Sequence, residues 1–184
     1  YAYRIPVSKY GKLSLGGQAG VTYYQANLAD LNIITANGQP DPIFAQTESR
    51  LLPYLGIGAY YYSRRTYVGL SLPTLINNRW NNETDYTQAR QKRHYFLSAG
   101  HVFSLSRNLK LKPNVLLKWV EGGAFQYDIN ANLLIHEMLW IGASYRMDDS
   151  IDGLLEMHIN NQLSLGYSYG HPISALSTLQ RGTH

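Results

Sequence analysis

The segment Gln126-Tyr-Asp-Ile-Asn-Ala-Asn-Leu-Leu-Ile135 alternates apolar and polar residues almost without a break. Its odd-numbered positions are Tyr, Ile, Ala, Leu and Ile, whereas Gln, Asp, Asn and Asn occupy the even-numbered positions as far as Asn132. Successive side chains of a β-strand point to opposite faces of a sheet, so this pattern predicts a strand with one apolar and one polar face.

The same period of two recurs along the whole chain. We count about ten such strands and no convincing helix, and many of the segments run about 9 to 13 residues. Strands of soluble proteins are most often about 5 to 6 residues long, whereas tilted membrane-spanning strands need about 9 to 11. The segments are Tyr1–Val7, Lys12–Tyr24, Arg50–Ser63, Val68–Leu72, Tyr95–Leu105, Leu111–Trp119, Gln126–Ile135, Leu139–Tyr145, Leu155–Ile159 and Leu163–Tyr169.

The connections between these segments alternate between short and long. Short ones are Ser8–Gly11, Ser63–Arg65, Ser106–Asn108, His136–Met138 and Asn160–Gln162, and between them lie Ala26–Ser49, Thr74–Lys92, Val120–Phe125 and Met147–Asp152. Outer-membrane barrels have short periplasmic turns at one end and longer extracellular loops at the other. The alternation therefore favours a membrane barrel over a soluble, Tyr-rich sugar-binding barrel, which stays open as an alternative.

The composition agrees with a membrane barrel and excludes several other classes. Charged residues make up 15% of the chain, there are 16 tyrosines, and the mean hydropathy is −0.28. No apolar run approaches the roughly 18 residues of a spanning helix. The absence of cysteine excludes disulfides and thiolate metal sites. Lys and Arg are scattered, which argues against nucleic-acid binding, and no signal peptide is visible, so we expect a mature form or a fragment.

A charge ladder is the one candidate site that the strand pattern predicts. If Trp119 pairs with Tyr127, Lys118 faces Asp128 on the polar face. A three-residue turn at His136–Met138 then places Asp128 opposite Arg146. Opposite charges side by side stabilise a sheet by about 0.2–1 kcal/mol per pair. We expect Lys118, Asp128 and Arg146 to line the lumen, either as a selectivity feature of a pore or as packing of a polar interior.

Signals for catalysis and metal binding are weak. His136–Glu137 begins like a zinc-protease motif, but Trp140 stands where the second histidine would be needed. The best nucleophile–base pair is Ser164 with His158, and Glu156 lies on the same face. Because serine and histidine are common here, we expect a chance pairing. The sequence therefore predicts no enzyme activity, no metal and no cofactor, with a membrane hydrolase as a remaining alternative.

An ordered string of motifs resembles the PorP/SprF family of type IX secretion membrane proteins along almost the whole chain. The motifs are Tyr1–Val7, Lys12–Val21, Tyr61–Leu75, Leu109–Lys118, Gln126–Leu133, Trp140–Arg146, Leu165–Tyr169 and Arg181–His184. Each piece alone is weak, and the order makes the resemblance specific. Gly170 departs from the pattern, because the family usually has Asp at that place.

The resemblance implies an all-β fold, a transmembrane antiparallel up-and-down β-barrel. Family barrels are larger than the strands counted here, so we expect these to be part of a barrel of about fourteen. Residues 1–184 would then form a single outer-membrane β-barrel domain, as a fragment that lacks N-terminal and C-terminal strands.

The resemblance further implies a non-catalytic outer-membrane component of the Bacteroidetes type IX secretion and gliding apparatus. Its expected partners are outer-membrane lipid, a periplasmic peptidoglycan-anchoring protein and secreted surface cargo, with Ala26–Ser49 and Thr74–Lys92 as the cargo-facing loops. The alternative from another class is an outer-membrane diffusion pore. An open lumen would be needed for a pore, and conductance in planar bilayers separates the two.

Overall fold

A computed structural model describes residues 1–27, 47–76, 79–80, 89–90, 92–160, 162–174 and 182–183. The strands are β1 (Ala2–Pro6), β2 (Lys12–Asn27), β3 (Thr47–Tyr62), β4 (Thr66–Leu72), β5 (Arg79–Trp80), β6 (Ala89–Arg90), β7 (His94–His101), β8 (Phe103–Ser104), β9 (Leu109–Val120), β10 (Phe125–Ile135), β11 (Leu139–Arg146), β12 (Ser150–His158) and β13 (Ser164–Pro172). None of the described residues belongs to a helix with the length and apolarity needed to cross a membrane.

The strands form one antiparallel up-and-down sheet, which confirms the predicted all-β fold. The sheet has 11 strands in the order β1-β2-β3-β4-β7-β9-β10-β11-β12-β13, with β8 paired to β9 off this path, and β5 pairs separately with β6. The path of ten strands corresponds to the ten predicted segments. β7 and β8 are one segment interrupted at Val102, opposite the middle of β9. Pro113 lies there and has no N–H to offer to the ladder.

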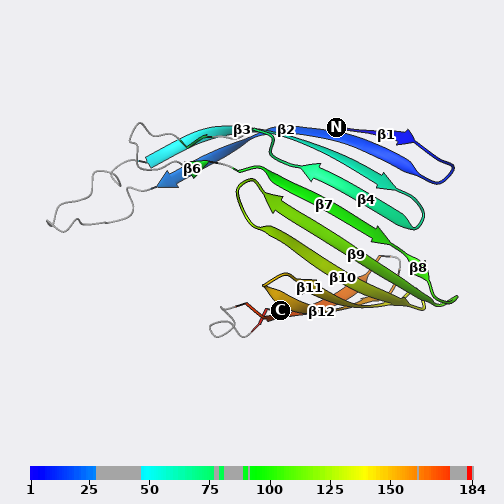
Figure 1. Ribbon diagram of the computed structural model, residues 1–184. Coiled ribbons are helices and arrows are strands. Elements are labelled where there is room, and N and C mark those ends of the chain that lie inside the picture. The colour runs from blue at the N-terminus through cyan, green and yellow to red at the C-terminus, as the bar shows by residue number, and fades with distance from the viewer. Residues whose placement is uncertain are drawn as a thin grey trace.

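The sheet is strongly curved. Figure 1 shows β1–β4 and β11–β12 on two sides of a trough, joined by β7, β9 and β10. Lys112 of β9 reaches Tyr67 of β4 and Trp140 of β11, although β7 and β10 lie between these strands. Gln18 of β2 likewise donates to the carbonyl of Pro73 across β3, at 3.2 Å. Side chains meet across an intervening strand only on the inside of a curve, so the face that carries these residues is concave.

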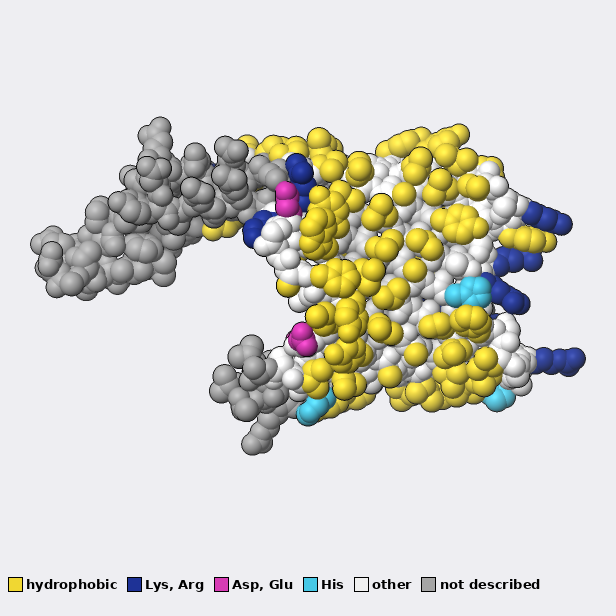
Figure 2. All heavy atoms as spheres, viewed as in Figure 1, with side chains coloured by type: hydrophobic (Ala, Val, Ile, Leu, Met, Phe, Trp, Pro, Cys, Tyr) yellow, Lys and Arg dark blue, Asp and Glu magenta, His cyan; other side chains and the backbone are white. Residues whose placement is uncertain are grey.

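The convex face is apolar and exposed. None of its ladder-paired residues in the described strands is Asp, Glu, Lys or Arg. Exposed fractions reach 69% for Leu51, 62% for Val21 and 58% for Leu165, and the described residues include no buried hydrophobic side chain. In Figure 2, hydrophobic side chains spread over the strands, and charged side chains gather at their two ends.

The concave face holds all charged strand residues whose side chains are described. These are Arg4, Lys12, Arg50, Lys110, Lys112, Lys118, Asp128, Arg146, Asp152 and Glu156. The distribution is the reverse of that in a soluble sheet, where the apolar face is buried. Alternating apolar-out and polar-in residues are the pattern of membrane β-barrels.

The predicted register is correct for one hairpin and wrong for the other. Asp128 pairs with Arg146, as predicted, because Met138 N donates to Ile135 O and closes a tight turn. His136 and Glu137 have φ values of 51° and 56°, the conformation of a type I′ turn. In the β9–β10 hairpin, Trp119 pairs with Phe125 rather than with Tyr127. The connection there is only residues 121–124, because the strands extend further than the sequence pattern indicates.

Candidate functional site on the concave face

The predicted charge ladder crosses three strands of the concave face. Lys118 Nζ lies 2.6 Å from Asp128 Oδ2, and Arg146 Nε lies 3.4 Å from Asp128 Oδ1. Arg146 also donates to Asp149 Oδ2 in the turn that follows β11, at 3.1 Å. The three predicted residues are therefore brought together, with Asp128 between the two cations. That this face is a lumen remains a prediction.

Lys118 reaches Asp128 diagonally rather than from directly opposite. Its ladder partner is Gln126, and Asp128 pairs with Leu116. A lysine side chain spans the diagonal between strand neighbours two positions apart, which is roughly 7–8 Å between backbones. Asp128 is the only buried charged side chain among the described residues, with 7% exposed. A carboxylate removed from water to this extent needs cationic partners, so both contacts stabilise its position.

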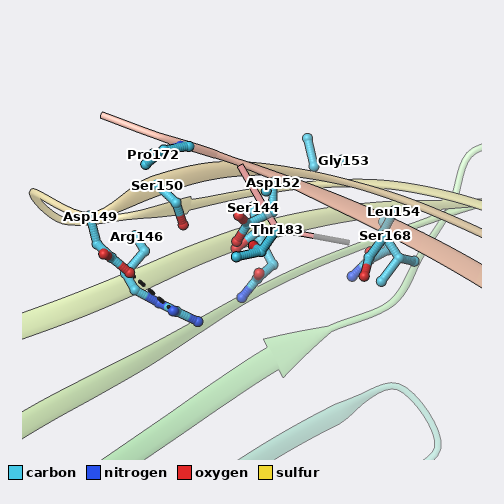
Figure 3. A pocket seen from close by; sticks show the side chains of 14 residues that line it. Ser144, Arg146, Asp149, Ser150, Asp152, Gly153, Leu154, Ser168, Pro172 and Thr183 are labelled. Carbon is cyan, nitrogen blue, oxygen red and sulfur yellow. Dashed lines mark hydrogen bonds and ion pairs between the residues drawn. The ribbon is translucent and has the colours of Figure 1, made fainter. Parts of the chain in front are cut away.

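A polar cavity of about 510 Å³ adjoins the ladder (Figure 3). Strands β10–β13 line it together with Thr183, whose backbone N–H and carbonyl both bond to Gly170, at 3.0 and 2.9 Å. Its polar side chains include Asn130, Asn132, Ser144, Arg146, Asp152 and Ser168. These amide, hydroxyl and charged groups are not arranged as a nucleophile with its base. Such a lining suits the binding of a polar peptide segment or of water.

Aromatic rings and a lysine form a second cluster nearer the short turns. The rings of Tyr60 and Tyr67 stack with centroids 6.0 Å apart. Lys112 Nζ lies 5.8 Å from the Tyr67 ring centroid and 5.9 Å from that of Trp140. Sequence reasoning missed Lys112 and Trp140. Their even numbers place them on the ladder's face, but contacts across an intervening strand depend on curvature, which the period of two does not encode.

The candidate catalytic pair is close in space, but its hydrogen bonds do not activate the serine. Trp140 Nε1 donates to His158 Nε2 at 3.1 Å, and His158 Nδ1 lies 2.6 Å from Ser164 Oγ. An indole N–H can only donate, so Nε2 accepts and a neutral His158 carries its proton on Nδ1. Nδ1–H then donates to Ser164, and the nitrogen that faces the hydroxyl has no free lone pair for a general base.

The remaining predicted features are placed as follows. Glu156 Oε1 lies 3.9 Å from His158 Nε2, beyond hydrogen-bond distance. Where the chain is described, no group of three or more His, Asp or Glu could hold a metal ion. The predicted cargo loops, Ala26–Ser49 and Thr74–Lys92, lie largely outside the described residues.

The fold and this face together define a curved antiparallel sheet with an apolar exterior and a charged, polar interior. A family model described as type IX secretion system membrane protein PorP/SprF matches residues 1–184. The chain therefore belongs to the PorP/SprF family of type IX secretion system membrane proteins. Comparison with curated protein sequences and with solved structures found no match.

Proposed function

We propose that this chain is the wall of a non-catalytic outer-membrane barrel of the type IX secretion and gliding apparatus. The single observation that carries the proposal is the exposed convex face, on which the described ladder-paired residues include no Asp, Glu, Lys or Arg. Exposure of this apolar face to water is unfavourable, whereas contact with lipid hydrocarbon is not. Membership of a family of secretion membrane proteins supports the same setting.

We infer that β1 pairs with a further strand in the complete barrel. Within the described residues β1 pairs only with β2. β13 pairs with β12, and a single β-bridge joins its residue Gly170 to Thr183. The outer edge of β1 presents backbone N–H and C=O groups, and each such group costs several kcal/mol if it faces hydrocarbon without a partner. Residues 1–184 would accordingly be one part of a single barrel domain of about fourteen strands.

The barrel would serve as a docking platform for periplasmic anchor proteins and for secreted or surface-retained cargo. The concave face supports this role, because it combines the polar cavity at β10–β13 with ion pairs that fix the side chains beside it. The hydrogen-bonded arrangement of His158 and Ser164 supports a platform rather than an enzyme.

Photo-crosslinking in the native outer membrane tests the docking role. A photoreactive residue at Asn132, which lines the cavity, is expected to capture a secreted protein or another type IX component, identified by mass spectrometry. The same residue at Leu155, on the convex face and 47% exposed, is the matched control and should capture lipid. The docking proposal fails if Asn132 captures no protein from cells that are actively secreting.

A diffusion pore is the second candidate, favoured by the charged concave face. Single-channel recordings of the full-length protein in planar bilayers separate the two functions. A docking barrel is expected to be silent. Stable conductance steps that change in ion selectivity when Lys118 is replaced by Gln would establish a pore instead.

A further inference from the structure

The turns at one end of the sheet form a continuous, basic rim. We define the short-turn rim as residues 7–11, 63–65, 105–108 and 136–138, the described connections that follow β1, β3, β8 and β10. Backbone hydrogen bonds link this end laterally: Val102 N donates to Arg65 O at 2.7 Å, and His136 N donates to Asn108 O at 2.8 Å. The rim is therefore fixed by the sheet.

Cations dominate this rim. Its residues include Lys9, Arg64, Arg65 and Arg107, all exposed, against the single acid Glu137. Figure 2 shows Lys and Arg side chains that project from one end of the strands. The opposite end is mixed in sign: connections 121–124 and 147–149 hold Glu121, Asp148 and Asp149, and Lys92 and Arg93 lie beside them before β7.

The cations of the rim are not neutralised from within the described part of the chain. Glu137 accepts a hydrogen bond from Lys110 at 2.5 Å, which lowers the pKa of Glu137 and keeps it ionised. This carboxylate is therefore already paired with Lys110. No described carboxylate forms an ion pair with Lys9, Arg64, Arg65 or Arg107. Arg64 instead stacks on Tyr10, with Cζ 3.9 Å from the ring centroid, and Lys9 Nζ lies 5.5 Å from the same centroid.

Apolar side chains lie directly beside these cations. Val7, Leu105 and Met138 belong to the same turns and are 59%, 56% and 54% exposed. The apolar band of the convex face therefore continues to the tips of the turns, so the rim lies at the boundary between hydrocarbon and water. Tyr10, 49% exposed, has the apolar ring and polar hydroxyl that suit this boundary. On the membrane placement proposed above, cations beside this apolar band would lie near the lipid phosphates.

We propose that the short-turn rim binds the headgroups of anionic phospholipids in the leaflet at that end, with Lys9, Arg64 and Arg65 as the principal contacts. The proposal rests on the membrane placement proposed above. Each Lys or Arg near an anionic surface contributes about 1 kcal/mol, or about fivefold in partitioning. The guanidinium groups of the adjacent Arg64 and Arg65 can each bind a phosphate through two N–H groups.

Lipid retention by the full-length protein tests this proposal. The protein is reconstituted into vesicles of phosphatidylethanolamine and phosphatidylglycerol in equal amounts and extracted gently, and retained lipid is identified by native mass spectrometry. We expect phosphatidylglycerol to be enriched on the wild type and R64Q/R65Q to lose at least about fivefold of that enrichment. K92Q/R93Q is the matched control, because it removes two adjacent cations before β7 at the opposite end, and it should retain the enrichment.

A separate arm tests whether the protein is in the membrane at all. Flotation with vesicles of zwitterionic phosphatidylcholine, which has no net charge, together with heat-dependent gel mobility, reports on the folded barrel and fails only if the proposed function fails. Equal retention of phosphatidylglycerol by wild type and R64Q/R65Q, or an equal loss in K92Q/R93Q, would overturn the lipid proposal. So would capture of an acidic periplasmic protein through Arg64 and Arg65 with no lipid enrichment.

Discussion

The ring of Tyr67 on β4 covers Gly100, its ladder partner on β7. A Cβ atom added at Gly100 would lie 2.5 Å from Tyr67 Cε1 and 2.6 Å from Cζ. Gly100 does not have a positive φ, so the position needs glycine for space rather than for backbone conformation. The ring cannot retreat easily, because Tyr60 stacks on it and Lys112 lies above it.

Gly100→Ala is therefore expected to destabilise the protein by about 1–3 kcal/mol, the usual cost of overpacking. Gly153→Ala is the control, because a Cβ there meets nothing within 4 Å, and it should be neutral or slightly stabilising. Urea unfolding of the full-length protein in lipid vesicles measures both. In a Tyr67→Ala background, Gly100→Ala should cost much less, and an unchanged cost would show that the ring is not the obstacle.

Removing the central charge of the ladder should be costly. Asp128→Asn leaves Lys118 and Arg146 facing an uncharged amide, and we expect a loss of about 1–3 kcal/mol in the free energy of unfolding. Glu121→Gln, in the exposed turn after β9, is the charge-matched control and should change little. A double-mutant cycle of Asp128→Asn with Lys118→Gln should give a coupling energy of about 0.5–3 kcal/mol, and additive effects would mean that the 2.6 Å contact contributes nothing.

Two adjacent leucines test which face meets lipid. Leu155 lies on the convex face and Leu154 on the concave face, and they are similarly exposed, 47% and 42%. An arginine that faces hydrocarbon costs about 2–4 kcal/mol near the bilayer midplane. Leu155→Arg should therefore reduce insertion, measured as the heat-modifiable fraction in outer membranes, whereas Leu154→Arg should be tolerated. Equal behaviour of the two variants would contradict the assignment of the faces.

Ser164 is expected to be unreactive. Because Trp140 fixes the proton of His158 on Nδ1, a fluorophosphonate probe should not label the wild-type protein. Trp140→Phe removes the hydrogen bond to His158 Nε2, so the imidazole proton is free to move to that nitrogen and this variant is the informative comparison. A known serine hydrolase is the positive control. Labelling of Ser164 in the wild type would contradict the hydrogen-bond assignment and reopen the hydrolase alternative.

The sequence predicts the strands and their faces well because both follow from the same period of two. The β10–β11 register also follows from it, since the tight turn at His136–Glu137 leaves no freedom. The β9–β10 register is wrong by two residues, and this kind of error is invisible to the pattern: a shift of two keeps every side chain on its own face. Only a shift of one would move polar groups into the apolar face.

The charge ladder could be predicted despite that error because a lysine side chain is long enough to reach Asp128 from the diagonal position. The contacts of Lys112 with Tyr67 and Trp140 could not be predicted, because they join strands that are not neighbours. Such contacts depend on how sharply the whole sheet bends.

The uncharged convex face also affects how the chain behaves before it is inserted into its membrane. Without lipid this apolar face has nothing to cover it, because the described residues include no buried hydrophobic side chain. If the chain is exported to an outer membrane, as proposed above, we expect it to aggregate through these strands unless other proteins keep it extended on the way. We expect its biogenesis to be limited by delivery to the insertion machinery rather than by the speed of folding.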